Sequence, residues 1–181
     1  MKENGKIDLK FISKNIVREI MKNMKNNLNE HIDKQMVKIE VSLDDMNPEF
    51  YGYIMEQLFS MGVNDVYIVQ VIMKKNRPGQ VLHILCREEI REKVMDFLFL
   101  ETTTLGIRYT PYTVHRLERT FIEVETEWGK CTVKIGKREG KIVQIAPEYE
   151  DCVRLAKEHQ VPIKWVYDLV KEKGYQWAKE Q

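Results

Sequence analysis

The stretch DVYIVQVIMKKNRPGQVLHILC, residues 65–86, places a strongly basic turn between two apolar runs. The runs at 65–73 and 80–86 have the length of strands and carry apolar residues on both faces, which predicts a buried hairpin. Backbone geometry explains three residues of the turn, namely Asn76, Pro78 and Gly79. It does not explain Lys74, Lys75 and Arg77, which indicate either a solvated turn that protects a sheet edge or an anion site.

The segments on both sides of this hairpin complete a recognisable order. Alternating apolar residues predict a strand over 37–43, and Asn47-Pro48 then opens a helix that Gly62 ends. Helical spacing returns over 88–101, and a last strand follows over 106–115. The order βαββαβ predicts a ferredoxin-like unit. Two helices cover only one face of such a sheet, so we expect another part of the chain or a second copy to cover the apolar residues on the other face.

The remaining sequence predicts two further parts, which makes the fold class α+β. Three short strands, with hairpin turns at Trp128-Gly129 and Glu139-Gly140, form a small β-meander over 119–145, and two C-terminal helices follow at 148–159 and 162–178. At the other end, apolar spacing predicts an amphipathic helix over 8–27, more typical of an accessory or docking helix than of a membrane-surface helix. We expect three regions: 1–35 (helix and linker), 36–117 (ferredoxin-like) and 118–181 (meander and helices).

The composition argues against several classes of protein. Charged residues make up 31% of the chain but the net charge is only +1, so a generally basic nucleic-acid binder is not indicated. The three cysteines are widely spaced and odd in number, which fits a reducing, cytoplasmic compartment rather than a disulfide framework. The sequence contains neither a signal-peptide core nor an apolar run long enough to cross a bilayer, so we expect no membrane association.

Two other segments carry groups suited to a phosphate or metal site. Asp44 and Asp45 lie at a strand end just before a helix, where they either complement the helix dipole or bind Mg²⁺ or Mn²⁺. The threonines Thr102, Thr103 and Thr104 precede Gly106 and Arg108. Their hydroxyls and the guanidinium suit an anion, although the same residues also suit a plain helix end.

The cysteines and histidines give weaker signals. Cys152 follows the acidic residues Glu148, Glu150 and Asp151, and we expect it to be a small buried side chain rather than a soft-metal ligand. The three acids suit the first turn of a helix and could equally bind a cation or ribose hydroxyls. The histidines lack metal-ligand spacing. We expect His83 to be a core residue, which leaves His115 as the better candidate for a site.

Four strings, DDMNPE, MKKNRPG, ETTTLG and APEYEDC, occur in an order that resembles the C-terminal half of the LarC family of nickel insertion proteins. The resemblance covers about residues 37–170. It implies CTP-dependent nickel insertion, or cyclometallation, into pyridinium-3,5-bisthiocarboxylic acid mononucleotide, with Mg²⁺ or Mn²⁺ assisting and Ni²⁺ as the inserted metal. It also implies a homo-oligomer that works with an N-terminal half which this chain lacks.

The resemblance assigns roles without naming a catalytic residue. Phosphate charge would be met by Lys74, Lys75, Arg77 and Arg108; hydroxyls would come from Thr102, Thr103 and Thr104; and Asp44 and Asp45 would hold the divalent ion. A regulatory or oligomerisation module without catalysis is the alternative, since a ferredoxin-like fold does not determine function. RNA binding ranks last, because the predicted strands lack an RNP-like aromatic pair.

Overall fold

The structure, a computed structural model, describes residues 29–181; the helix expected over 8–27 lies outside the described residues. The described residues divide into two compact units, Ile32–Val114 and the C-terminal unit formed by His115–Gln181 with residues 29–31. Each unit has its own hydrophobic core. Within residues 29–181, no helix is both long and apolar enough to cross a membrane.

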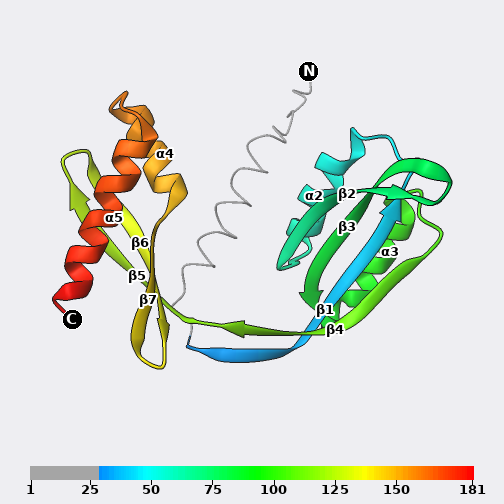
Figure 1. Cartoon of the computed structure of the whole chain (residues 1–181), viewed down its shortest axis with the longest axis horizontal. Helices are drawn as coiled ribbons and strands as arrows, with labels where there is room; N and C mark the ends of the chain where they lie inside the picture. The colour runs from blue at the N-terminus through cyan, green and yellow to red at the C-terminus, as the bar shows by residue number, and fades with distance from the viewer. Residues whose placement is uncertain (1–28) are drawn as a thin grey trace, which may run out of the picture. The chain divides into compact units, whose positions relative to one another are not determined.

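The first unit follows the predicted βαββαβ order, and its antiparallel sheet has the strand order β2-β3-β1-β4 (Figure 1). Short 3-10 turns, η1 and η2, precede β3 and α3. The elements are β1 (His31–Leu43), α2 (Phe50–Ser60), β2 (Asp65–Met73), η1 (Lys74–Asn76), β3 (Arg77–Arg87), η2 (Glu88–Ile90), α3 (Arg91–Glu101) and β4 (Ile107–Arg116). The α+β class and the ferredoxin-like order are therefore confirmed.

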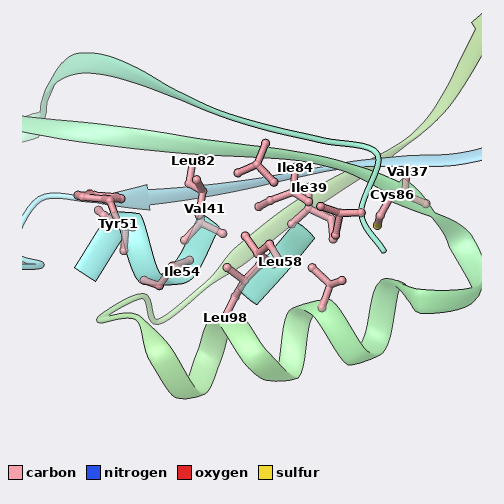
Figure 2. Close-up of a cluster of buried hydrophobic side chains, with 14 of the residues drawn as sticks. Val37, Ile39, Val41, Tyr51, Ile54, Leu58, Leu82, Ile84, Cys86 and Leu98 are labelled. Carbon is pink, nitrogen blue, oxygen red and sulfur yellow. The ribbon is translucent and has the colours of Figure 1, made fainter. Parts of the chain in front are cut away.

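The core of this unit lies between the sheet and its two helices (Figure 2). Alternate residues of β1 point into it, and so do alternate residues of β3, because successive side chains of a strand face opposite sides. Ile54 and Leu58 of α2 and Leu98 of α3 are fully buried against them. On the opposite, helix-free face, Tyr67 and Val69 of β2 are 43% and 41% exposed, so residues 29–181 leave these two side chains uncovered.

The second unit is a three-stranded meander with two helices, as predicted. It comprises β5 (Glu118–Thr126), β6 (Gly129–Arg138), β7 (Lys141–Pro147), α4 (Tyr149–Glu158) and α5 (Ile163–Lys179). Helix α5 approaches the sheet closely at Gly174, where an added Cβ would lie 2.8 Å from Ile145 Cγ2. The absence of a side chain at Gly174 therefore sets how near the helix can pack.

Some expected boundaries differ from the structure. Strand β1 begins at His31 rather than at residue 37, because its first residues are mostly polar and give no apolar alternation. Strand β3 begins at Arg77 rather than at residue 80, since Met73 already pairs with Arg77. The first meander turn is Glu127-Trp128, one residue earlier than expected, whereas Glu139-Gly140 forms the second turn with φ of 50° and 76°.

Candidate functional site

Strand β1 delivers two carboxylates to one end of the four-stranded sheet. Leu43 ends the strand in the core, and Asp44 and Asp45 follow it directly. Arg77 Nη1 donates to Asp44 Oδ2 at 3.1 Å, and the Thr103 hydroxyl donates to Asp45 Oδ1. The two aspartates therefore contact partners from two other segments, the basic turn and the α3–β4 connection.

The basic turn is held next to the end of β1 by a close backbone approach. A Cβ at Gly79 would lie 2.8 Å from the carbonyl oxygen of Leu43, so only glycine fits there without a shift of the backbone. Lys75 and Asn76 have φ of 62° and 55°, a left-handed conformation that shapes the turn. A hollow of about 340 Å³ lies beside it, lined by Gln70, Val71, Ile72, Pro78, Gly79 and Gln80.

The three threonines use their hydroxyls differently. Thr102 Oγ1 donates to the carbonyl oxygen of Leu98 at 2.6 Å, and Thr104 Oγ1 donates to that of Gly106 at 2.9 Å. These two hydroxyls therefore close the helix end and the loop. Thr103 is the member of the run that reaches a carboxylate.

Arg108 extends this arrangement onto the helix-free face. Its Nη2 donates to the Ser42 hydroxyl at 2.6 Å, across from β4 to β1. The end of β1, the basic turn and the α3–β4 connection thus meet at one end of one sheet. We call this place the sheet-end site and define it by Asp44, Asp45, Lys74, Lys75, Arg77, Thr102, Thr103, Thr104 and Arg108.

The cysteine and the acidic residues at the start of α4, which the sequence offered as further candidates, make contacts within the C-terminal unit. Cys152 is fully buried with its Sγ 3.8 Å from that of Cys131, and burial raises the pKa of both thiols, so both remain protonated and poor metal ligands. Asp151 accepts a hydrogen bond from the Thr132 amide at 2.9 Å, and Glu148 pairs with Lys134 at 3.3 Å. These acids fix the start of α4. Among residues 29–181, no group of three or more metal-ligating side chains is found.

The expectation that His83 lies in the core is wrong. It is on β3, but its side chain is on the helix-free face and is 12% exposed. Its ring stacks on Tyr67 with a centroid distance of 4.7 Å, and Nδ1 lies 3.2 Å from Glu40 Oε1, although not aligned as a hydrogen bond. Lys38 Nζ contacts the same carboxylate oxygen at 3.0 Å. We call Lys38, Glu40, Tyr67 and His83 the face cluster.

The charges of the face cluster depend on one another. The hydrogen bond from Lys38 lowers the pKa of the Glu40 carboxyl, and the same bond raises the pKa of Lys38. Burial lowers the pKa of His83, and the positive charge of Lys38 lowers it further. The cluster therefore holds an ionised carboxylate, a lysine cation and a neutral imidazole at neutral pH. Sequence reasoning missed it, although the alternation of Lys38, Glu40 and Ser42 along one strand was a usable signal.

Comparisons with known proteins agree with the predicted resemblance. The model of the nickel insertion protein family matches residues 4–167. A pyridinium-3,5-bisthiocarboxylic acid mononucleotide nickel insertion protein of Acetivibrio thermocellus is 44% identical over 156 residues, which is 86% of this chain and 38% of that protein. Its counterpart in Thermotoga petrophila is 42% identical over 137 residues, 76% of this chain and 34% of that protein. The chain thus spans little more than a third of these relatives.

Solved structures give the same result. LarC2, the C-terminal domain of a cyclometallase involved in the synthesis of the NPN cofactor of lactate racemase, is 31% identical with a TM-score of 0.73. The match covers 84% of this chain and all of that one. A protein from Methanopyrus kandleri, 24% identical with a TM-score of 0.60 over 80% of this chain and 90% of its own, shares the fold. The resemblance to the C-terminal half of LarC is confirmed, and the chain belongs to the nickel insertion protein family.

Proposed function

We propose that this chain is the CTP-binding, C-terminal part of a system that inserts nickel into pyridinium-3,5-bisthiocarboxylic acid mononucleotide. The relatives' names supply the nickel insertion and the substrate. The resemblance to LarC supplies CTP, and the N-terminal half of that system is the partner. Residues 36–117 form the nucleotide-binding domain in this proposal, and residues 118–181 form a second domain, made of the β-meander and the two C-terminal helices.

The observation that carries the proposal is the meeting of three segments at the sheet-end site. A triphosphate needs several cations. Lys74 and Lys75 lie in η1 and Arg77 begins β3, while Arg108 on β4 reaches Ser42 near the end of β1. Arg77 is 54% exposed at its side chain, so it can exchange its contact with Asp44 for one with phosphate. Positive groups at this place would stabilise the charge of a pyrophosphate leaving group.

The aspartates suit a divalent ion that arrives with the nucleotide. Mg²⁺ is commonly held by one or two carboxylates together with substrate phosphates, and Asp44 and Asp45 provide that number. Each has one oxygen in the contacts described above and a second oxygen left for an ion. Of the threonines, Thr103 is best placed to act with them, because Thr102 and Thr104 would have to give up their bonds to main-chain carbonyls.

A nucleotide titration with variants tests the proposal. Purified chain is titrated calorimetrically with CTP, ATP, GTP and UTP, each with Mn²⁺, and we expect selective binding of CTP. The double variant Lys75→Ala/Arg77→Ala removes two phosphate contacts, so CTP affinity should fall by about 100-fold while the circular dichroism spectrum is retained.

A matched control removes the same kinds of charge elsewhere. Arg154 is 46% exposed and pairs with Glu158 at 3.1 Å, much as Arg77 pairs with Asp44, and Lys157 lies near it on α4. The double variant Arg154→Ala/Lys157→Ala should bind CTP like the wild type. Unchanged affinity in the folded Lys75→Ala/Arg77→Ala variant would contradict the sheet-end site.

A non-catalytic module is the second candidate, in which this chain binds a ligand or assembles copies without supporting turnover. The exposed Tyr67 and Val69 on the helix-free face favour an assembly role. Light scattering would give the number of copies. Release of CMP and pyrophosphate from CTP, measured with the N-terminal half, nickel and the mononucleotide substrate present, would favour the enzymatic function.

A further inference from the structure

A row of polar residues leads from the sheet-end site across the helix-free face. Lys38, Glu40 and Ser42 are every second residue of β1, so they share this face. Ser42 is bonded to Arg108, and Asp44 of the sheet-end site follows along the chain. At a rise of about 3.3 Å per residue, Glu40 lies about 13 Å from Asp44. An extended nucleoside triphosphate can bridge that distance.

Glu40 is a hydrogen-bond acceptor in a fixed position. Lys38 and His83 lie 3.0 Å and 3.2 Å from the same oxygen, Oε1, and the side chain is 32% exposed. The other oxygen, Oε2, therefore remains available. A carboxylate held in this way accepts N–H groups and repels carbonyl oxygens, because it has no proton to donate at neutral pH.

An aromatic surface lies beside this carboxylate. Tyr67 and His83 come from neighbouring strands at paired positions, and their rings are stacked with an interplanar angle of 17°. His83 is also paired with Glu40, so its ring lies between Tyr67 and the carboxylate, and the open side of Tyr67 faces away from Glu40. The stack therefore fixes the His83 ring beside Glu40. Contacts that distinguish one base from another must come from Glu40 and Lys38, the members of the face cluster on β1.

We propose that the face cluster binds the base of the nucleotide and that Glu40 selects an amino group over a carbonyl oxygen on the pyrimidine edge. This inference rests on the proposed function, since the phosphates would occupy the sheet-end site. Cytosine would donate its exocyclic amino group to Glu40 while Lys38 donates to a neighbouring ring acceptor. Uracil would place a carbonyl oxygen against the carboxylate, which should weaken binding by about 10- to 100-fold.

The test compares CTP, UTP and inorganic tripolyphosphate, each with Mg²⁺, on the wild type and on Glu40→Gln. Glutamine has almost the same shape but offers both an acceptor and donors. We expect the CTP-to-UTP preference to fall towards one in Glu40→Gln, while the affinity for tripolyphosphate is unchanged. Glu123→Gln is the matched control, because Glu123 also pairs with a lysine, Lys130, at 2.6 Å on a sheet, but in the C-terminal unit.

A second measurement follows ligand binding by NMR in the wild-type protein. The imidazole proton signals of His83, assigned by their loss in His83→Gln, should shift when CTP is added and should stay in place with tripolyphosphate.

The possible outcomes distinguish a failure of the base site from a failure of the proposed function. An unchanged CTP-to-UTP ratio in Glu40→Gln, or a His83 signal that does not respond to CTP, would overturn the base site while phosphate binding stands. If neither the nucleotides nor tripolyphosphate bind, the proposed function itself is overturned and the base site with it.

Discussion

The two sheets of this protein are both antiparallel and both covered by helices on one face, yet they use their charged residues differently. On the three-stranded sheet, Lys130 pairs with Glu123 at 2.6 Å and Lys137 pairs with Glu118 at 3.8 Å, one cation to one carboxylate. On the four-stranded sheet, one carboxylate oxygen of Glu40 lies 3.0 Å from Lys38 Nζ and 3.2 Å from His83 Nδ1. Isolated exposed pairs contribute little to stability, whereas converging groups with shifted pKa values are typical of functional sites.

The largest expected effect tests whether the two cores are separate. Leu58→Ala removes a fully buried side chain from the first core and should lower the free energy of unfolding by about 2–5 kcal/mol. All three tryptophans, Trp128, Trp165 and Trp177, lie in the other unit and report on that unit by fluorescence. We therefore expect Leu58→Ala to change the unfolding transition seen by far-UV circular dichroism and to leave the tryptophan transition in place.

Leu155→Ala is the counterpart in the second core, and it should move the tryptophan transition by a similar amount. If either variant moved both transitions equally, the two cores would form one cooperative unit and the comparison would fail.

A smaller effect is expected where α5 packs on the three-stranded sheet. Gly174→Ala places a methyl group 2.8 Å from Ile145 Cγ2 and 3.1 Å from Val133 Cγ1, so it should destabilise the tryptophan-reported transition by about 1–3 kcal/mol through overpacking. Gly52 is also inside a helix, but no atom lies within 4 Å of its would-be Cβ. Gly52→Ala should therefore stabilise the first unit by about 0.4–1 kcal/mol in chemical denaturation. Equal signs for the two variants would contradict the packing argument.

The smallest expected effect is a loss of folding stability at acidic pH that depends on His83 of the four-stranded sheet. The pKa of His83 is lowered in the folded protein, so the unfolded chain binds more protons between the folded pKa and 6.5. Stability is then fully present above pH 6.5 and declines as the pH falls through that window. Melting temperatures from pH 7.5 to 5.5 should drop more for the wild type than for His83→Gln. Parallel profiles would show that His83 gains its proton equally in both states.

The segments of the candidate site could be picked out in the sequence because their polar groups follow element ends. Asp44 and Asp45 end an alternating strand, the cations occupy a turn between two apolar runs, and the threonines follow a helix, so each segment was identified separately. Which of them meet was not readable, since that depends on strand order and on the backbone approach at Gly79. His83 was misplaced because an apolar run hides which alternate residues face the helices.

The sequence by itself determined the ferredoxin-like order, the meander with two helices and the membership of the nickel insertion protein family, because hydrophobic period, turn residues and characteristic strings are local properties of the chain. Tertiary structure decided the rest. Pairing of β1 with β3 sets Glu40 opposite His83, and β4 beside β1 brings Arg108 to Ser42. These contacts join residues far apart in sequence, so they exist only when a strand register has been chosen, and burial of the alternate face in the core is what fixes that register.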